Sequence, residues 1–400
     1  MSFNNILSDY VLNLNESATL KMSQMARNLK AEGKDVISLS IGEPDFDTPS
    51  FVNEAAKKAL DDGFTHYTPV PGLVDFRQAI VDKLKRDNGL EYDINNIVVS
   101  NGAKQSISNL CQALINPGDE VIIFTPYWVS YIEIVRLAGG MPVCISASVD
   151  NDYKVTPEQV KEAISPKTKF ILFSSPCNPT GSVYTKAELK GIADVVDQHD
   201  DIFIISDEIY EYIVFDGNHH SIAQNEHVFN QTIVVNGMSK GYAMTGWRLG
   251  YIAAPHFIAK ACAKIQGQVT SGATAFGQKA AATALRAPLT APIQMRDVFL
   301  KRRDMMLSEL RKIEGLKLSV PQGAFYIFPD CSAFYGKSYN GQVINDSNDL
   351  AMSILQEVHI ALVAGSAFGA PNCMRISYAA SEDQLQEACR RLQKYFDKLN

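Results

Sequence analysis

The chain contains, at residues 236–250, the sequence NGMSKGYAMTGWRLG. It lies between two short apolar runs of strand length, Ile233–Asn236 and Gly250–Ala253. It places Lys240 in a small turn flanked by glycine, and Arg248 follows eight residues later. A carbonyl cofactor needs a lysine amine to form an imine, and its phosphate needs a guanidinium to hold it. One turn between two strands therefore contains both groups.

Simpler interpretations exist for each residue taken alone. Lys240 as a solvated loop lysine would be ordinary, and Arg248 would form a surface ion pair. The interpretation therefore depends on what the rest of the chain places near this turn.

The two apolar runs belong to a longer series that alternates with helical patterns. Strands are predicted at Ile97–Ser100, Glu120–Phe124, Pro142–Ile145, Lys169–Ser174, Ile202–Asp207, Ile233–Asn236 and Gly250–Ala253. Helices are predicted between them at Lys104–Ile115, Ser130–Ala138, Pro157–Ile164, Lys186–Gln198 and Pro255–Ile265. Nearly continuous apolar strands are typical of strands buried on both faces. The pattern predicts an α/β fold with a mostly parallel seven-stranded sheet flanked by helices.

The pattern of predicted helices and strands changes after the proline-containing stretch at residues 288–292. A long charged helix is predicted at Met295–Ile313, and strands are predicted near Lys317–Val320, Ala324–Phe328 and Met374–Tyr378. A closing amphipathic helix begins at Glu382. A chain of 400 residues is longer than one hydrophobic core usually grows. The second region is therefore expected to form a smaller α+β domain.

Composition and charge exclude several classes of protein. The net charge of −7 comes with scattered basic residues, so nucleic acid is not an expected partner. The apolar runs are too short to span a membrane, and Met1–Asn15 lacks the basic start of a signal peptide, so a cytoplasmic location is expected. The seven cysteines are widely spaced and often apolar in setting, which indicates reduced core residues and no metal site.

Polar residues follow three further predicted strands. Asp207 ends one strand, where a buried carboxylate is costly without a partner such as a protonated ring nitrogen. Gly102-Ala103-Lys104 joins a strand to a helix, a geometry that presents free N–H groups to an anion. Asn178 follows in a proline-containing turn. Plain turns and helix caps would account for the last two sites singly, but ligands collect at the carboxyl ends of such strands.

Other phosphate motifs are missing from the sequence. No GxGxxG follows a strand, and no GxxxxGK[ST] occurs, so neither a dinucleotide fold nor a P-loop is supported.

These segments, together with IGEPDF at 41–46 and TPYW at 125–128, resemble the class I/II pyridoxal-phosphate-dependent aminotransferases. The resemblance runs from about Ser17 to the C-terminal helix and includes bacterial aspartate aminotransferases. It implies the aspartate aminotransferase fold, with a large cofactor-binding domain at 48–292. The small domain would combine residues 1–47 with residues 293–400.

The resemblance also implies a role for each residue that matches a family motif. Lys240 would form the Schiff base with pyridoxal phosphate and then move the proton at the substrate α-carbon. Asp207 would hold the pyridine N–H, and Tyr210 and Asn178 would contact the ring hydroxyl oxygen. The remaining cofactor-binding residues implied are Trp128 on the ring face, Arg248 with Gly102, Ala103 and Lys104 at the phosphate, and Tyr67 from a neighbouring subunit.

Tyr67 in that role implies a homodimer with shared active sites. One departure concerns the phosphate, because many relatives have serine where this chain has Gly237. Whether Ser239 compensates stays open at this point.

Substrate residues are implied in the same way. Arg375 would bind the α-carboxylate in a pocket that Gly42, Asn178 and Trp128 line, although a strand-edge arginine is the simpler interpretation of Arg375 alone. Lys104 and Thr19, in Ser17-Ala18-Thr19, resemble the subgroup that binds a distal carboxylate. L-Aspartate and 2-oxoglutarate are the expected pair, and aromatic amino acids, alanine and prephenate are alternatives.

Two rival functions share these motifs. A carbon–sulfur β-lyase or a cyclopropane-forming synthase on the same fold would use the same cofactor residues. A cofactor-sensing regulator would need a DNA-binding segment, whereas only about forty residues precede Gly42. Transamination is the expected activity, because the two rivals do not account for Lys104 and Thr19.

Overall fold

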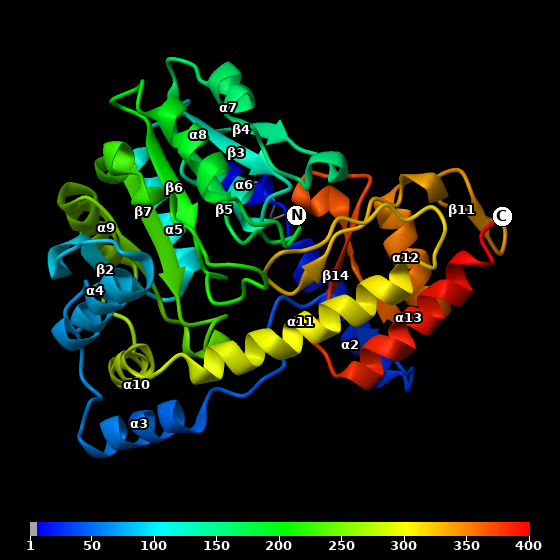
Figure 1. Cartoon of the computed structure of the whole chain (residues 1–400), viewed down its shortest axis with the longest axis horizontal. Coiled ribbons are helices and arrows are strands. Elements are labelled where there is room, and N and C mark those ends of the chain that lie inside the picture. The colour runs from blue at the N-terminus through cyan, green and yellow to red at the C-terminus, as the bar shows by residue number, and fades with distance from the viewer. Residues whose placement is uncertain (1–5) are drawn as a thin grey trace.

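The computed structural model describes residues 6–400 of the chain, so residues 1–5 of the expected small domain and of the signal-peptide analysis lie outside it. The large part of the structure is built on a seven-stranded sheet, and a smaller part lies beside it around α13 (Glu382–Phe396) (Figure 1). Within the described residues, no helix combines the length and the apolar composition needed to cross a membrane.

The large sheet confirms the predicted α/β architecture. Its strands are β2 (Ile97–Ser100), β3 (Glu120–Thr125), β4 (Met141–Ser146), β5 (Thr168–Ser174), β6 (Phe203–Asp207), β7 (Thr232–Gly237) and β8 (Gly250–Ala253). They lie in the order β2-β8-β7-β6-β5-β3-β4. Only β8 runs antiparallel to its neighbours, and all other pairs are parallel. The sheet is therefore mostly parallel, as the sequence predicts.

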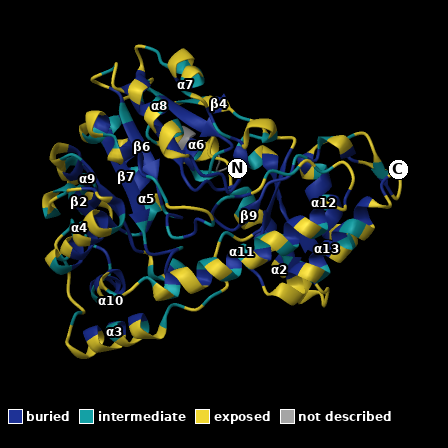
Figure 2. Ribbon diagram, in the orientation of Figure 1, coloured by how far each residue is buried: buried dark blue, intermediate teal, exposed yellow. Residues whose placement is uncertain are grey.

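Helices cover both faces of this sheet, and neighbouring strand residues point to opposite faces. Ile123 packs with α5 and α9 on one face, whereas Ile122 packs with α8 on the other. The helices of this part are α3 (Ser50–Asp61), α4 (Val74–Asn88), α5 (Ala103–Leu114), α6 (Ser130–Leu137), α7 (Pro157–Ala163), α8 (Lys186–Val196), α9 (His256–Val269) and α10 (Ala275–Arg286). Figure 2 shows the central strands in the buried colour and the helices exposed on their outer sides. Burial on both faces explains the continuous apolar strands.

Local sequence signals set several helix ends. At the start of α8, the Thr185 side chain accepts from the Glu188 amide and the Glu188 carboxylate accepts from the Thr185 amide. This capping box satisfies amide groups that have no partner inside the helix. The long helix α11 (Thr290–Leu310) begins five residues before the predicted Met295. Pro292 is tolerated there because the first turn of a helix needs no N–H from it.

The edge strand β4 departs from the expectation of burial on both faces. Met141 is 58% exposed, and Cys144 is exposed as well. The reason is its place at the end of the strand order, where Pro142 also costs no ladder hydrogen bond on the free side. The other six cysteines are buried and free, as expected of reduced core residues.

The smaller part contains three small sheets and four longer helices. Its strands are β1 (Ile37–Ser38), β9 (Tyr326–Ile327), β10 (Ser338–Tyr339), β11 (Gln342–Val343), β12 (Ile360–Ala361), β13 (Val363–Ala364) and β14 (Met374–Ser377). Its helices are α2 (Ala18–Ala31), α11, α12 (Ser347–Val358) and α13 (Glu382–Phe396), and the short α1 (Asp9–Leu12) precedes them. One hydrophobic cluster joins these helices to β1, β9, β12 and β14.

Segments from the two ends of the chain meet in this part. β1 pairs in parallel with β12, where Ile37 lies opposite Ile360. We propose on this basis that residues up to 47 and from 293 onward form one domain, with 48–292 as the other.

The prediction of a strand near Lys317–Val320 is wrong. The segment makes a single antiparallel bridge, between Lys317 and Asp330. Pro321 and Pro329 lack the amide hydrogens that would extend a ladder on either side.

Candidate active site

A cavity of about 260 Å³ opens at the carboxyl ends of the parallel strands, between the two parts of the structure. It brings together most of the residues singled out from the sequence. These are Thr19, Gly42, Ala103, Lys104, Trp128, Asn178, Asp207, Tyr210, Lys240, Arg248 and Arg375. Gly102 lies directly beneath Arg248, and only Tyr67 is absent from this group.

The sheet topology explains this convergence. Asp207 ends β6, Asn178 follows β5, and Lys240 follows β7. Their strands are adjacent and parallel, so their carboxyl ends meet at one edge. Arg375 comes from β14 of the smaller part, whose segments close the cavity from the other side.

Lys240 lies in the turn after β7 and reaches the smaller part of the structure. Its Nζ donates to the carbonyl oxygen of Gly42 at 2.5 Å. Removal from water lowers the pKa of the ammonium group to about 8, although the charge of Glu43 opposes this shift. About a tenth of the amine is therefore neutral at pH 7, far more than for an ordinary lysine, which suits a nucleophile and a base.

Asp207 is buried, with 5% of its surface exposed. Burial raises the pKa of its carboxyl group to about 6, although a hydrogen bond from Tyr131 opposes the shift. The Tyr131 hydroxyl donates to Oδ2 at 2.6 Å, and the amide of Ile209 donates to Oδ1. Among the described residues, no lysine or arginine forms an ion pair with Asp207, so a cationic partner can still bind there.

Tyr131 and Tyr326 are functional candidates that the sequence did not reveal. Tyr131 comes from α6, three residues after Trp128, and its ring meets that of Trp128 edge-on at 5.5 Å. The hydroxyl groups of Tyr210 and Tyr326 lie 2.8 Å apart. Trp128 precedes α6, which begins at Ser130, so no helical spacing links it to Tyr131, and buried tyrosines on helices usually serve packing.

Arg375 is a buried cation with no acidic partner among the described residues. Its Nη1 donates to Asn178 Oδ1 at 2.9 Å, and its Nη2 donates to the carbonyl oxygen of Ser40 at 2.6 Å. Its Nε atom is buried without a hydrogen-bond partner. Burial lowers the pKa of the guanidinium. An incoming carboxylate would satisfy both the free donor and the charge.

A candidate anion site lies at the start of α5. Arg248 donates to the carbonyl oxygens of Thr245 and Asn101, and none of the described carboxylates neutralises it. A Cβ at Gly102 would lie 2.5 Å from Arg248 Nη2, so glycine is needed for this close approach. The free N–H groups and positive end of α5 thus face a guanidinium, which favours a phosphate between them.

Close packing explains why position 237 is glycine, which the sequence alone did not reveal. A Cβ there would lie 2.6 Å from the carbonyl oxygen of Leu249 and 2.8 Å from the Cα of Gly250. Serine at this position would force the strands apart. Ser239 does line the cavity, so a hydroxyl is present near the phosphate side.

Lys104 and Thr19 lie at the outer part of the cavity. Lys104 Nζ is 5.0 Å from the centre of the Trp128 ring, and partial burial together with the charge of Arg248 lowers its pKa. Thr19 comes from α2, and its Oγ1 is buried without a hydrogen-bond partner. Both groups can donate to an anionic substrate end.

Tyr67 lies away from this cavity. It is 99% exposed and borders a separate hollow with Phe64, His66 and Phe276. Within one chain it contributes nothing to the site.

The charged and hydrogen-bonding groups of the cavity fit pyridoxal phosphate. Lys240 offers an amine, Asp207 offers a buried carboxylate to a protonated ring nitrogen, and Arg248 with α5 offers an anion site. Each of these groups lacks an oppositely charged side chain within the described residues. One cavity therefore contains the three charged groups that the amine, ring nitrogen and phosphate chemistry of this cofactor requires.

The stability of the cofactor-free protein is expected to depend on Asp207. Its pKa is about 6 when folded and near 3.8 when unfolded, so the folded state binds more protons between these values. The ionisation of Asp207 therefore lowers the free energy of unfolding as pH rises from about 4 to 6, by up to about 3 kcal/mol. Asp207→Asn should consequently be more stable than wild type at pH 7 but not at pH 4, in urea unfolding. The exposed Asp200→Asn is the control, and equal curves for both variants would contradict the expectation.

The comparisons with known proteins agree over almost the whole chain. A family model described as aminotransferase class I and II matches residues 34–392. A probable aspartate/prephenate aminotransferase of Rhizobium leguminosarum bv. phaseoli is 44% identical over 393 residues, or 97% of this chain and 98% of that protein.

Solved structures agree as well. The aspartate aminotransferase of Rhizobium meliloti superimposes with a TM-score of 0.95 at 40% identity, covering 98% of this chain and 99% of that one. The Thermus thermophilus aspartate aminotransferase with maleate has a TM-score of 0.92 at 38% identity, covering 97% and 99%. The likeness therefore includes both parts of the structure.

Proposed function

Because this chain belongs to the class I and II aminotransferases, we propose that it transfers the amino group of L-aspartate to 2-oxoglutarate. It is a pyridoxal-phosphate-dependent aminotransferase. The observation that carries the choice of substrate is the pair of cationic side chains, Arg375 and Lys104, in the same cavity as Lys240. Two cations beside one reactive amine suit a dicarboxylic amino acid.

Bound pyridoxal phosphate supplies an aldehyde for the amino group and a ring that accepts electrons from the substrate α-carbon. We propose that Lys240 holds this aldehyde and that Asp207 pairs with the ring N–H. Tyr210 and Asn178 would hold the ring oxygen, and Trp128 would cover the ring face. Arg248, with the amides of Gly102, Ala103 and Lys104, binds the phosphate, as the anion site at α5 supports.

Lys240 has a second proposed task as the proton carrier. With the cofactor and substrate bound, its Nζ would take the proton from the substrate α-carbon and would hold it for return. The lowered pKa, about 8, leaves part of the amine neutral and thus able to accept that proton. Asp207 keeps the ring nitrogen protonated, so electrons released at the α-carbon can enter the ring.

Two groups of residues would orient the substrate. Arg375, beside Asn178 and Gly42, binds the α-carboxylate through its free Nε and its fork of donors. Lys104 and Thr19 bind the distal carboxylate. The Thermus thermophilus relative with maleate, itself a dicarboxylate, supports a site with two anion-binding ends.

Lys104→Met is expected to change specificity more than general activity. A hydrogen bond to a charged group contributes about 1.5–3 kcal/mol, so kcat/KM for aspartate should fall roughly 10- to 100-fold. The value for alanine, which has no distal carboxylate, should stay within about twofold. Steady-state kinetics with both substrates measure this, and Lys264→Met on α9 is the matched control. Equal losses for aspartate and alanine would mean that Lys104 does not bind the distal carboxylate.

Prephenate is a second candidate acceptor. The Rhizobium leguminosarum relative is named a probable aspartate/prephenate aminotransferase, and prephenate also has two carboxylates. Aromatic amino acids, alanine and β-elimination from cysteine are less well matched to the pair formed by Arg375 and Lys104.

A homodimer belongs to this proposal. Tyr67 is almost fully exposed beside a hollow, and we propose that it reaches the phosphate in a second copy. A cytoplasmic location also stays a prediction.

The visible absorption spectrum tests the proposed function. The protein is purified with pyridoxal phosphate, and its spectrum is recorded before and after L-aspartate, L-phenylalanine, L-alanine or L-cysteine. Aspartate should remove the band of the lysine-bound cofactor, and 2-oxoglutarate should restore it. A band that responds only to another amino acid would overturn the substrate, and pyruvate formed from cysteine would favour a lyase.

A further inference from the structure

The turn that carries Asp207 and Tyr210 has a second, buried side. Its sequence is Asp207-Glu208-Ile209-Tyr210-Glu211, and the hydrogen bond from Glu211 N to the carbonyl oxygen of Glu208, at 2.9 Å, closes it. Asp207 and Tyr210 line the cavity, whereas Glu208 and Glu211 do not. Glu208 is 1% exposed and Glu211 7%. Two carboxylates are therefore buried directly behind two active-site side chains.

Lys83 of α4 holds the second of these carboxylates. Its Nζ donates to Glu211 Oε2 at 2.5 Å and to Asn88 Oδ1 at 2.7 Å, and Asn88 Nδ2 also donates to Glu211. The Lys83 side chain is completely buried. A buried lysine is rare unless it is paired, and here it connects a surface helix to the active-site turn.

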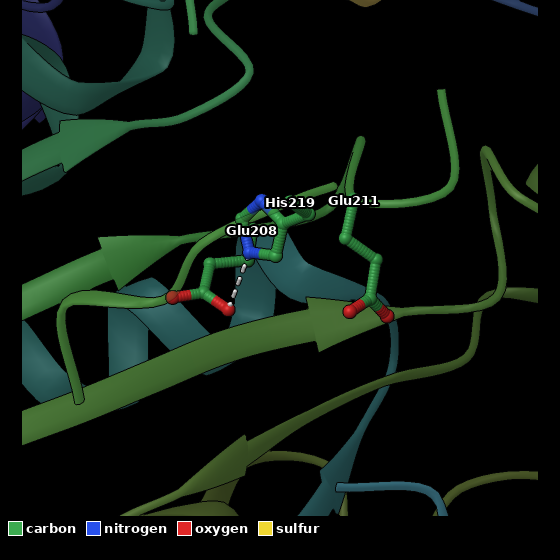
Figure 3. A group of neighbouring side chains, drawn as sticks. All are labelled: Glu208, Glu211 and His219. Atoms are coloured by element: carbon green, nitrogen blue, oxygen red, sulfur yellow. Dashed lines mark hydrogen bonds and ion pairs between the residues drawn. The ribbon is translucent and has the colours of Figure 1, made fainter. Parts of the chain in front are cut away.

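Glu208 is held separately. Ser206 and Ser221 donate to its Oε1, and the His219 ring contacts its Oε2 at 3.0 Å. Figure 3 shows this contact, with the Glu211 carboxylate lying apart from it. Glu208, Glu211 and His219 are residue types that bind metals. However, hydroxyls and His219 already hold Glu208, and Lys83 already neutralises Glu211, so the two carboxylates belong to two separate hydrogen-bonded groups.

We propose that the buried Lys83–Glu211 ion pair is a positioning device that fixes the Tyr210 hydroxyl in the active site. Removing one partner of a buried pair leaves a charge that the interior cannot solvate. Without Lys83, Glu211 must turn toward water or take up a proton. Because one peptide bond separates Glu211 from Tyr210, that movement displaces the Tyr210 hydroxyl from its place 2.8 Å from Tyr326.

The functional effect rests on the proposed function, in which Tyr210 contacts the ring oxygen of the cofactor. A hydrogen bond from Tyr210 stabilises negative charge on that oxygen. It therefore lowers the pH at which the visible absorption band of the lysine-bound cofactor changes. The pH midpoint of that band therefore reports where Tyr210 lies, whereas a residue that only stabilises the fold would not move it.

Lys83→Met is the test, with Arg77→Met as the matched control. Arg77 is a buried cation on the same helix, and its partner is the carbonyl oxygen of Ile94 at 2.9 Å, not the turn. In Lys83→Met the band midpoint should rise by about one pH unit, and kcat should fall about tenfold with little change in KM. Arg77→Met should lose stability while its midpoint and kcat stay at the wild-type values.

Three outcomes decide the matter. If both variants lose stability and neither midpoint moves, the ion pair is only structural and the positioning role is wrong. If Lys83→Met does not fold, Glu211→Gln, which keeps the side-chain shape, should show a smaller shift in the same direction, and no shift would overturn the role. If wild type shows no cofactor band, the proposed function fails by itself. The crystal structure of Lys83→Met then decides, because an unmoved Tyr210 would contradict the inference.

Discussion

Lys240→Ala is expected to lower kcat at least about 10⁴-fold, the upper end of what a positioned proton-transfer group contributes. The variant should bind pyridoxal phosphate but show no band of lysine-bound cofactor. The described residues place two lysines in the cavity, and Lys240 lies among the charges of Asp207 and Arg375, whereas Lys104 is more exposed and lies beside Arg248. No other described residue therefore offers an amine at the same place.

Rescue by a small amine makes this test specific. Alanine leaves space in the cavity, so added methylamine should restore part of the activity in proportion to its concentration. The exposed Lys260→Met on α9 should behave as wild type with or without methylamine. A Lys240→Ala protein that keeps its rate would show that another group moves the proton.

Arg375→Met is expected to lower kcat/KM for aspartate by about 10³-fold. Truncating one side of a buried charge pair costs about 2–5 kcal/mol, and here the other side would be the substrate α-carboxylate. The free Nε and the absence of an acidic partner among the described residues are the reasons to expect so large an effect. Most of the change should appear in KM.

Arg375→Lys separates charge from geometry. Lysine keeps the cation but loses the planar fork, so kcat/KM should lie between those of wild type and Arg375→Met. Steady-state kinetics with aspartate and alanine should show equal losses, because both substrates have the α-carboxylate. A loss confined to aspartate would assign Arg375 to the distal carboxylate.

The strands of the large sheet were predictable because burial on both faces leaves a continuous apolar signal. β2 and β8 have the predicted bounds, and the ends of the other five strands differ by one residue. The segment at 317–320 failed because its alternation is real but prolines stop the ladder after one bridge. A strand needs a neighbouring strand to pair with as well as alternating apolar residues, and the local sequence does not reveal the neighbouring strand.

Part of the site was predictable from chemistry and sheet topology together, whereas Arg375 and Thr19 were expected only from the family resemblance. Lys240, Asp207 and Asn178 follow strands, so the parallel sheet alone brings them together. Tyr131 and Lys83 escaped prediction because each acts through one hydrogen bond to a distant segment, 76 and 128 residues away. A tyrosine or lysine on a helix gives no sign of such a contact.

The parallel pairing of β1 with β12 has a consequence for biosynthesis. Ile37 can pair only after Ile360 has been synthesised. Because ribosomes add about 5–20 residues per second, the synthesis of the two strands is separated by about tens of seconds. During that time the apolar face of α2, with Met22 and Ala26, has no core to join. The nascent chain therefore presents this face to chaperones or to other nascent chains until its last helices emerge.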